Sequence, residues 1–278
     1  MTTHHKIIFG NCMSMNEIDD QTVHLMVTSP PYFNAPFDYQ GLYSSYDNYL
    51  NVLQSFAKEA YRVLQNGRIS VLNIDDMLVD GRKYPIVADA TKIFMEAGFN
   101  YRDRITWKKP DGYLRISRRS GVLLQNPYPM YFYPDNLLEN IIIFQKGKFD
   151  YKSKSKEERE LSKIDKVEFQ EKKWYSTLWE MVNVLPNSSN NLEKGIAAFP
   201  DELPYRIIKL FSYKGETVLD PFLGSGTTIK VARLLERNSI GIEMLENLEE
   251  TIKEKIGFGK TISLFNTEDT LEVIKRSS

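Results

Sequence analysis

The sequence predicts an α/β fold, with a mostly parallel sheet covered by helices on both faces. Short runs of β-branched and other apolar residues alternate with longer stretches whose apolar residues recur every three or four positions. This is the pattern of successive β–α–β units. The 278 residues, 42% of them hydrophobic and 26% charged, suit one large domain or one domain with an inserted module.

Strands and two helices are expected in the first half of the chain. The strands are residues 6–9, 23–27, 69–74, 104–107 and 140–144. The first helix runs from Tyr46 to Leu64 and is followed by a stop signal, Asn66-Gly67. The second helix opens at Pro85, whose fixed φ suits a first helical turn, and ends before Gly98.

The second half is expected to hold an insertion and then regular β and α elements. Residues 146–173 are rich in Lys, Glu and Ser, with few recurring apolar positions, which indicates an insertion or mobile arm outside the core. Ordered structure is expected again at residues 174–179. The remaining elements are a helix over 201–211, a strand over 217–219, a helix over 229–236 and a strand over 239–242.

Charge is segregated along the chain. The net charge is −1, from 36 Lys and Arg against 37 Asp and Glu, which taken whole is not typical of a basic nucleic-acid-binding protein. Residues 102–119, however, hold seven basic and two acidic residues, a net charge of +5, whereas residues 241–272 carry a net charge of −5. A polyanion is therefore expected to meet one face of the molecule only.

Residues that usually build disulfide and metal sites are scarce. The single cysteine, Cys12, excludes a disulfide framework and a four-cysteine zinc site, and we expect it to be a structural residue. His4, His5 and His24 show no metal-ligand spacing, so no metal is expected. No apolar stretch approaches the ~20 residues of a membrane span, and no secretory signal is evident, which favours a cytoplasmic protein.

The segment Asp220-Pro-Phe-Leu-Gly-Ser-Gly-Thr-Thr228 predicts a ligand-binding turn between a strand and a helix. Gly224 and Gly226 let the backbone turn tightly and approach a ligand, and the following helix start favours a carboxylate or other anion. Asp220 is expected to take a ligand's ammonium group. Glu243 ends the next strand, the usual place for a carboxylate that binds ribose hydroxyls.

Two common nucleotide-binding loops are not matched. Gly224-Ser-Gly226 is followed by Thr-Thr-Ile, which breaks the G-x-G-x-x-G pattern, and no G-x-x-x-x-G-K-[ST] occurs to grip phosphates. The ligand is therefore predicted to be a nucleoside with a zwitterionic tail, the form of S-adenosylmethionine, rather than a polyphosphate. The alternative is an ordinary strand–turn–helix whose glycines serve geometry alone.

The segment Thr28-Ser-Pro-Pro-Tyr32 follows a strand and predicts a rigid pair of hydrogen-bond acceptors. Its two prolines fix the backbone and cannot continue a central strand. Ser29 Oγ and the carbonyl oxygen of Pro30 are expected to accept from one exocyclic amine, and Tyr32 offers a face on which a base can stack. The alternative is a plain proline turn.

Together these two loops resemble those of S-adenosylmethionine-dependent DNA amino-methyltransferases of the N4-cytosine/N6-adenine group. The first resembles that family's catalytic (D/N/S)-P-P-(Y/F) motif in its serine form, and the second resembles its cofactor loop. The resemblance implies a Rossmann-like class I methyltransferase fold: a mostly parallel, doubly wound sheet with an antiparallel strand and a small inserted target-recognition region. The catalytic motif comes before the cofactor loop, which in this family marks the circularly permuted β order.

The resemblance also implies roles for individual residues. Catalytic roles fall to Ser29, Pro30, Pro31 and Tyr32. Cofactor binding falls to Asn11, Phe199, Pro200, Asp220, Phe222, Gly224, Ser225, Gly226, Thr227, Thr228 and Glu243. Asn11 stands where the family usually has Asp near the adenine, and a simple turn residue is the alternative there. The implied organisation is a catalytic half (1–145), an inserted target-recognition region (146–195) and a cofactor half (196–278).

The implied reaction moves a methyl group from S-adenosylmethionine to the exocyclic amine of a flipped base at a specific DNA site, in a restriction-modification system. The serine form of the motif and the segment Phe199–Leu203 resemble N4-cytosine enzymes, so cytosine N4 is preferred and adenine N6 is the alternative. An RNA amino-methyltransferase and a catalytically dead DNA-binding module are further alternatives. Ser29 is a poor base and is expected to orient the amine, whose proton leaves after transfer.

Double-stranded DNA is the expected partner. Phosphate contacts or guanine readout are expected from Lys108, Lys109, Arg115, Arg118 and Arg119, with a solvated basic surface as the alternative. Stacking or wedge roles are expected for Tyr113, Tyr128, Tyr131 and Tyr133, with core tyrosines as the alternative. A cognate restriction endonuclease is expected to act separately, and the protein is expected to be a prokaryotic monomer or homodimer, associated with the nucleoid through DNA.

Overall fold

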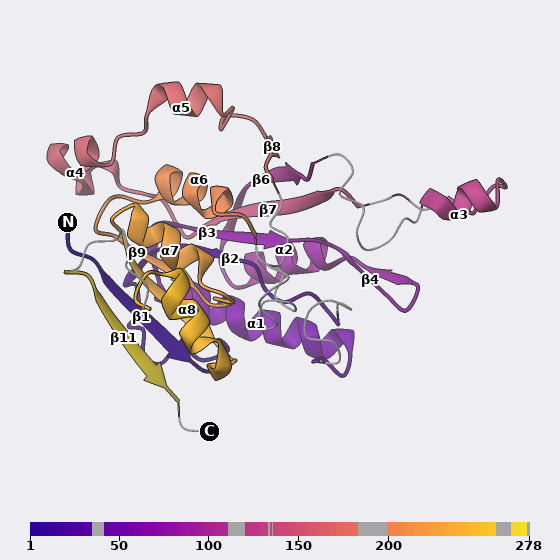
Figure 1. Cartoon of the computed structure of the whole chain (residues 1–278), viewed down its shortest axis with the longest axis horizontal. Helices are drawn as coiled ribbons and strands as arrows, with labels where there is room; N and C mark the ends of the chain where they lie inside the picture. The colour runs from indigo at the N-terminus through magenta and orange to yellow at the C-terminus, as the bar shows by residue number, and fades with distance from the viewer. Residues whose placement is uncertain are drawn as a thin grey trace.

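A nine-stranded sheet forms the centre of the computed structural model, which describes residues 1–34, 42–110, 120–132, 134, 136–182, 199–259 and 268–276. The strand order is β11-β1-β10-β9-β2-β3-β7-β6-β8 (Figure 1). The strands are β1 (His4–Phe9), β2 (Val23–Thr28), β3 (Leu64–Ile74), β6 (Asn100–Lys108), β7 (Leu138–Gln145), β8 (Leu178–Glu180), β9 (Thr217–Asp220), β10 (Asn238–Glu243) and β11 (Thr270–Lys275). Among these nine strands, β7 alone runs antiparallel, to β3 and to β6. The predicted mostly parallel sheet with an antiparallel strand is confirmed.

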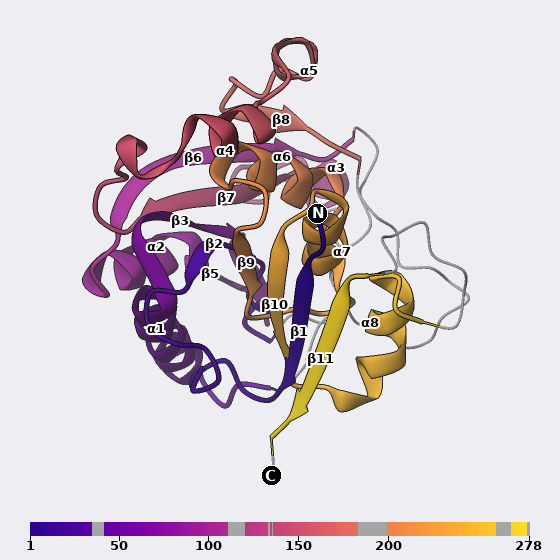
Figure 2. The same cartoon turned by 90° about the vertical axis from the view of Figure 1, so that its left-hand side faces the viewer.

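Helices cover both faces of the sheet (Figure 2). The helices of the described ranges are α1 (Tyr46–Val63), α2 (Ile86–Glu96), α3 (Ser120–Gln125), which lies on a projecting arm (Figure 1), α4 (Lys156–Leu161), α5 (Lys166–Glu171), α6 (Glu202–Phe211), α7 (Thr227–Leu234) and α8 (Glu249–Lys255), with 3-10 turns η1 (Tyr151–Ser153) and η3 (Glu246–Leu248). Successive side chains of a strand point to opposite faces. In β2, Met26 joins the core under α1 and α2, whereas Leu25 and Val27 join the core under α6 and α7. Two apolar layers of this kind make the sheet doubly wound, as predicted.

The two ends of the chain meet in the sheet. β1 pairs parallel with β10, with Phe9 opposite Glu243, and on its other side pairs parallel with β11. The strand leading to Asn11 is therefore a neighbour of the strand ending at Glu243. No helix within the described ranges is both long and apolar enough to cross a membrane.

Several elements differ from the sequence-based expectation. β4 (Met77–Val79) and β5 (Arg82–Tyr84) form an unpredicted hairpin whose turn residues, Asp80 and Gly81, both have positive φ. Asp-Gly is a preferred pair for a two-residue hairpin, so a signal for it was present. α7 begins at Thr227, two residues before its predicted start, because the N-cap Gly226 already turns the chain with a φ of 94°.

Residues 146–173 lie outside the three core clusters, as expected for an insertion, and they contact the rest of the domain. Lys154 Nζ lies 2.6 Å from Glu216 Oε1, and Lys209 Nζ lies 2.8 Å from Glu168 Oε2. Phe149 stacks on Tyr213, with ring centroids 6.4 Å apart. Lys154 and Glu168 of this segment thus pair with residues of the rest of the chain, which composition alone does not reveal.

Candidate active site

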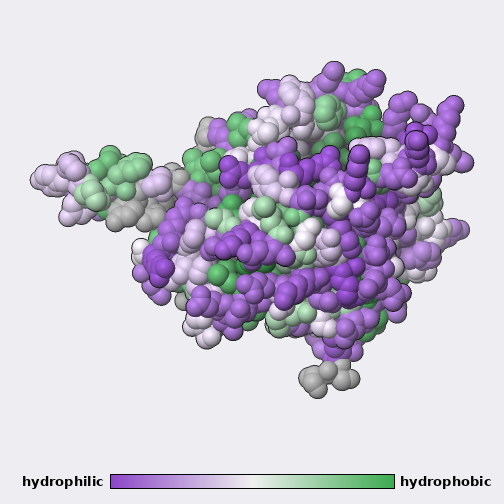
Figure 3. Space-filling model, turned by 180° about the vertical axis from the view of Figure 1, so that it is seen from behind, coloured by the Kyte–Doolittle hydropathy of each residue, from purple (hydrophilic) through white to green (hydrophobic). Residues whose placement is uncertain are grey.

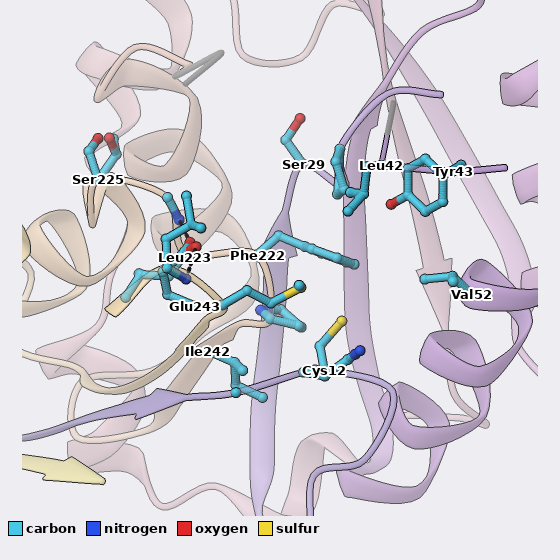
Figure 4. A pocket seen from close by; sticks show the side chains of 18 of the residues that line it. Cys12, Ser29, Leu42, Tyr43, Val52, Phe222, Leu223, Ser225, Ile242 and Glu243 are labelled. Carbon is cyan, nitrogen blue, oxygen red and sulfur yellow. Dashed lines mark hydrogen bonds between the residues drawn. The ribbon is translucent and has the colours of Figure 1, made fainter. Parts of the chain in front are cut away.

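A pocket of about 270 Å³ lies at the carboxyl ends of β1, β2, β9 and β10. The helices that follow β2 and β9 leave toward opposite faces of the sheet, so this is the topological switch point at which α/β sheets bind ligands. The lining residues that the sequence predicted are Asn11, Ser29, Pro31, Phe199, Phe222, Gly224, Ser225, Thr227 and Glu243. The lining residues that it missed include Gly10, Leu42, Tyr43, Asn48, Val52, Leu223, Ile242, Met244 and Leu245. The two predicted loops therefore share one cavity (Figure 4).

Asp220 joins the two loops. Its Oδ1 accepts a hydrogen bond from Thr28 Oγ1 at 2.6 Å and from the Phe222 N–H at 3.2 Å, and its Oδ2 accepts one from Thr228 Oγ1 at 2.6 Å. Asp220 is 1% exposed and is not among the residues that line the pocket. Burial raises the pKa of its carboxyl to about 6. Asp220 thus ties the catalytic loop to the cofactor loop, and its contact with a ligand ammonium stays a prediction.

Glu243 fixes the turn that follows β9. Its Oε2 accepts from the Gly224 N–H at 2.8 Å and its Oε1 accepts from the Leu245 N–H at 3.0 Å. Gly224 and Gly226 have φ values of 54° and 94°, in the left-handed region that favours glycine. Burial raises the pKa of the Glu243 carboxyl. The carboxylate lies at the pocket wall, beside Leu223 (Figure 4).

The other predicted cofactor residues divide into lining residues and their neighbours. Asn11 lines the pocket, and its Oδ1 accepts from the Met13 N–H at 2.9 Å. Ser225 Oγ accepts from Lys255 Nζ at 2.6 Å. The predicted residues that do not line the pocket adjoin lining residues in the chain: Pro200, Asp220, Gly226 and Thr228.

Ser29 presents its hydroxyl oxygen as an acceptor. It donates its hydrogen to the carbonyl oxygen of Asn73 at 2.9 Å, so its Oγ lone pairs are acceptors, and the Tyr32 hydroxyl also interacts with this side chain. Ser29 lies at the end of the pocket above Phe222, with its hydroxyl pointing away from that ring (Figure 4). The geometry suits the predicted role of orienting an amine.

Tyr32 is buried beside the pocket. It is 5% exposed and is not among the lining residues. Its hydroxyl donates to Glu139 Oε2 at 3.4 Å, a long contact. Burial raises the pKa of this phenol well above its ordinary value. A base can stack on the Tyr32 ring only if neighbouring atoms uncover a face, so stacking stays a prediction.

A polar cluster that the sequence did not predict lies next to this loop. Asn73 Nδ2 donates to Glu139 Oε2 at 2.6 Å, and Lys109 Nζ lies 2.5 Å from Glu139 Oε1. Asp75, at the end of β3, accepts from Asn140 Nδ2 at 3.2 Å. The sequence contains one indication of this cluster, because Asn73 is a polar residue inside the largely apolar run Ile69–Ile74.

The predicted DNA-binding residues have mixed outcomes. Lys108 Nζ lies 3.5 Å from Glu180 Oε1, and Lys109 Nζ pairs with Glu139 Oε1, so both ammonium groups have a carboxylate partner. Tyr128 and Tyr131 are 66% and 45% exposed, so they are not core residues. Arg115, Arg118, Arg119, Tyr113 and Tyr133 lie outside the described residues.

Cys12 is buried and lines the pocket, and burial raises the pKa of its thiol to about 12. The thiol therefore stays protonated at neutral pH, which suits a structural role rather than that of a nucleophile.

Comparisons of sequence agree with this geometry. A family model described as DNA methylase, of the N6/N4 methyltransferases, matches residues 23–254. The type II methyltransferase M.MjaI of Methanocaldococcus jannaschii is 37% identical, over 96% of this chain and 97% of that protein. The type II methyltransferase M.MthZI of Methanothermobacter thermautotrophicus is 32% identical, over 96% of this chain and 79% of that protein.

Comparisons of structure give the same fold. TTHA0409 of Thermus thermophilus, assigned as a DNA modification methylase and solved with S-adenosyl-L-methionine, superposes with a TM-score of 0.73 and 26% identity, over 99% of both chains. The PvuII DNA methyltransferase, which is cytosine-N4-specific, superposes with a TM-score of 0.67 over 95% of this chain and 89% of that one. Its 20% identity bears on the fold alone. The chain belongs to the N6/N4 DNA methylase family and is an S-adenosylmethionine-dependent DNA methyltransferase.

Proposed function

We propose that this protein methylates the exocyclic amine of a base flipped out of a specific site in double-stranded DNA, with cytosine N4 as the preferred target and adenine N6 as the alternative. One observation carries the proposal: Ser29 of the catalytic loop and Glu243 of the cofactor side line a single pocket. The serine form of the motif supports cytosine. A separate cognate restriction endonuclease and a monomeric or homodimeric state belong to the same proposal.

The residues around the pocket fit S-adenosylmethionine, which supplies an activated methyl group on a sulfonium. Phe222 and Ile242 provide apolar wall for the nucleoside, and Glu243 is a carboxylate suited to ribose hydroxyls. The N–H groups at the start of α7, beyond Gly226, suit the methionine carboxylate. Asn11 lies on the same wall and is assigned to the adenine.

Catalysis then depends on placing and polarising the target amine. Ser29 Oγ and the carbonyl oxygen of Pro30 accept its two N–H groups, which draws the nitrogen toward tetrahedral geometry and frees its lone pair for in-line attack. Ser29 keeps its own proton on the carbonyl of Asn73. Once it has accepted the methyl group, the target nitrogen carries a positive charge and is strongly acidic, so its proton leaves after methyl transfer.

The test is to methylate unmethylated duplex DNA with labelled S-adenosylmethionine, digest it to nucleosides, and sequence the same DNA by a methylation-sensitive method. We expect label in N4-methylcytosine, at one sequence motif. Label only in N6-methyladenine would establish the alternative base. Label in RNA but not in DNA would overturn the assignment of substrate. Cofactor binding without transfer to either nucleic acid would indicate a catalytically dead DNA-binding module.

The affinity for S-adenosylmethionine is expected to rise between pH 5 and pH 7 if ionised Asp220 meets the ammonium group. The pKa of Asp220 is about 6 in the free protein, and a cation lowers it on binding, so binding releases a proton and strengthens as pH rises. The cofactor's amine stays protonated across this range, since its ordinary pKa is about 7.7–8.0. Calorimetric titration measures the trend, which should vanish in Asp220→Asn. An identical trend in both proteins would exclude this contact.

DNA is proposed to approach the edge of the sheet that is formed by strand ends, where β6 ends and β7 begins. The connection between them carries exposed apolar side chains on a projecting arm, residues 122–132 (Figure 3). β8 pairs with the last residues of β6 at the same edge, Lys108 being opposite Glu180. By contrast, Lys154 lies against Glu216, just before β9 begins, at the opposite edge. We therefore assign target recognition within 146–195 to residues from Trp174 onward.

Tyr128→Ala is expected to weaken DNA binding by about tenfold, since one stacked aromatic ring contributes roughly 1–3 kcal/mol to binding of a base. Tyr151→Ala is the matched control, because Tyr151 is 69% exposed against 66% for Tyr128 but lies on η1, away from this edge. Fluorescence anisotropy of a labelled duplex measures both. Equal affinities for the two variants would remove the arm from the DNA interface.

A further inference from the structure

Glu139 lies where three segments meet beside the catalytic loop. It is the second residue of β7, and its side chain is 14% exposed. Its Oε2 accepts from Asn73 Nδ2 at 2.6 Å and from the Tyr32 hydroxyl at 3.4 Å, and its Oε1 lies 2.5 Å from Lys109 Nζ. One carboxylate therefore contacts β3, the catalytic loop and the end of β6.

Asn73 links Glu139 to Ser29 through two hydrogen bonds. Its backbone carbonyl accepts the Ser29 hydroxyl at 2.9 Å, while its side-chain amide donates to Glu139. A carboxylate can only accept, so Glu139 fixes which end of the amide faces it. Asn73 Oδ1 is then buried with no hydrogen-bond partner among the described residues, in a side chain that is 2% exposed. Such an acceptor costs about 1–3 kcal/mol unless a substrate brings it a donor.

Lys109 supplies the counter-charge that a mostly buried carboxylate needs. Its side chain is 17% exposed, and its ammonium nitrogen lies 5.6 Å from the centre of the Trp107 ring. This placement assigns Lys109 to Glu139 rather than to a DNA phosphate, and it ties the catalytic loop to the connection from which DNA is proposed to be contacted.

We propose that Glu139 is a positioning residue for methyl transfer, which holds Ser29 in place through Asn73, holds Tyr32 by direct contact, and leaves Asn73 Oδ1 as an acceptor for the substrate. The inference rests on the proposed function of the Ser29–Tyr32 loop. It adds a second layer to the site, in which Glu139 orders residues that touch the base without touching the base itself.

Glu139→Ala, measured in single turnover with labelled S-adenosylmethionine and unmethylated DNA, should transfer methyl at least about tenfold more slowly. The dissociation constant for S-adenosylmethionine should stay within about threefold, because Glu139 is not among the residues that line the pocket. Glu168→Gln is the matched control: it also removes a charge that pairs with a lysine, at 2.8 Å from Lys209 Nζ, and its side chain is 20% exposed, but it lies on α5, outside the residues assigned to target recognition. Its rate should stay within about twofold of wild type.

A double-mutant cycle tests the route through Asn73. If Glu139 acts through that residue, Glu139→Ala in an Asn73→Ala background should slow transfer little further. Glu139→Gln keeps an oxygen for Asn73 but loses the pairing with Lys109, so it should be slowed less than Glu139→Ala. It also serves if the alanine variant does not fold, as judged by thermal melting.

Three outcomes would overturn the inference: wild-type rates in folded Glu139→Ala and Glu139→Gln, additive effects in the cycle, or a loss of cofactor affinity as large as the loss of rate. Failure of the proposed function is a separate result, since the wild-type protein would then transfer no methyl group to DNA.

Discussion

Tyr32→Ala is expected to lower the turnover of DNA methylation by about a hundredfold while changing the dissociation constant for S-adenosylmethionine by less than about threefold. Stacking on one aromatic ring contributes roughly 1–3 kcal/mol per base, and a hundredfold in rate corresponds to about 2.7 kcal/mol. Tyr32 does not line the cofactor pocket, so its loss should act on the base. Steady-state methylation and calorimetry with the cofactor alone separate the two effects.

Tyr32→Phe is the control for this experiment. The ring and its packing remain, while the contacts of the hydroxyl, including the 3.4 Å contact with Glu139 and the interaction with Ser29, are lost, so turnover should stay within about fivefold of wild type. The alanine variant removes a side chain that is 5% exposed, which can cost about 3–5 kcal/mol of stability. Thermal melting must therefore show that both variants are folded at the assay temperature. If cofactor affinity falls as far as turnover does, Tyr32 is not the plate on which the base stacks.

Glu243→Gln is expected to weaken S-adenosylmethionine binding by about ten- to a hundredfold. Both carboxylate oxygens accept backbone N–H groups, from Gly224 and Leu245. A glutamine has one oxygen, so its amide N–H₂ must face one of these donors and the turn beside the pocket is disturbed. Hydrogen bonds to charged groups contribute about 1.5–3 kcal/mol each, which sets the size of the effect. Calorimetric titration of the cofactor in the absence of DNA measures it directly.

Glu246→Gln is the matched control for that variant. Glu246 lies three residues further on, with a side chain that is 54% exposed and 3.7 Å from Lys275. An exposed pair of this kind contributes about 0–1 kcal/mol, so cofactor affinity should match wild type. Unchanged affinity in Glu243→Gln would mean that neither the ribose contact nor the pinned turn matters for the cofactor.

Much of the fold was predictable because the core strands carry long apolar runs. The residues of β3 and β7 gave clear strand signals, since both faces of these strands are buried under helices. β8, with three residues, is too short to show a period, and β11 is held at the sheet edge by pairing with β1. The packing of residues 146–173 depends on ion pairs such as Lys154 with Glu216, and composition does not identify the partner.

The catalytic and cofactor loops were readable from the chain itself because their shapes are local. Adjacent prolines after β2 restrict the backbone wherever they stand, and glycines at 224 and 226 permit the positive φ values that the turn adopts. The chemistry of these two loops and the class of reaction were therefore determined by contiguous residues. The contacts that support these two loops were not determined by contiguous residues.

Only the tertiary structure decided how the two loops are joined and supported. Thr28 and Asp220 are 192 residues apart and meet at 2.6 Å because β2 and β9 are neighbours in the sheet. Asn73 and Glu139 are 66 residues apart and meet because β3 pairs with β7. A hydrogen bond between distant residues leaves no local pattern, since either side chain would be equally acceptable on a solvated surface. The packing of the core determines the order of the strands, and this order brings these residues together in one site.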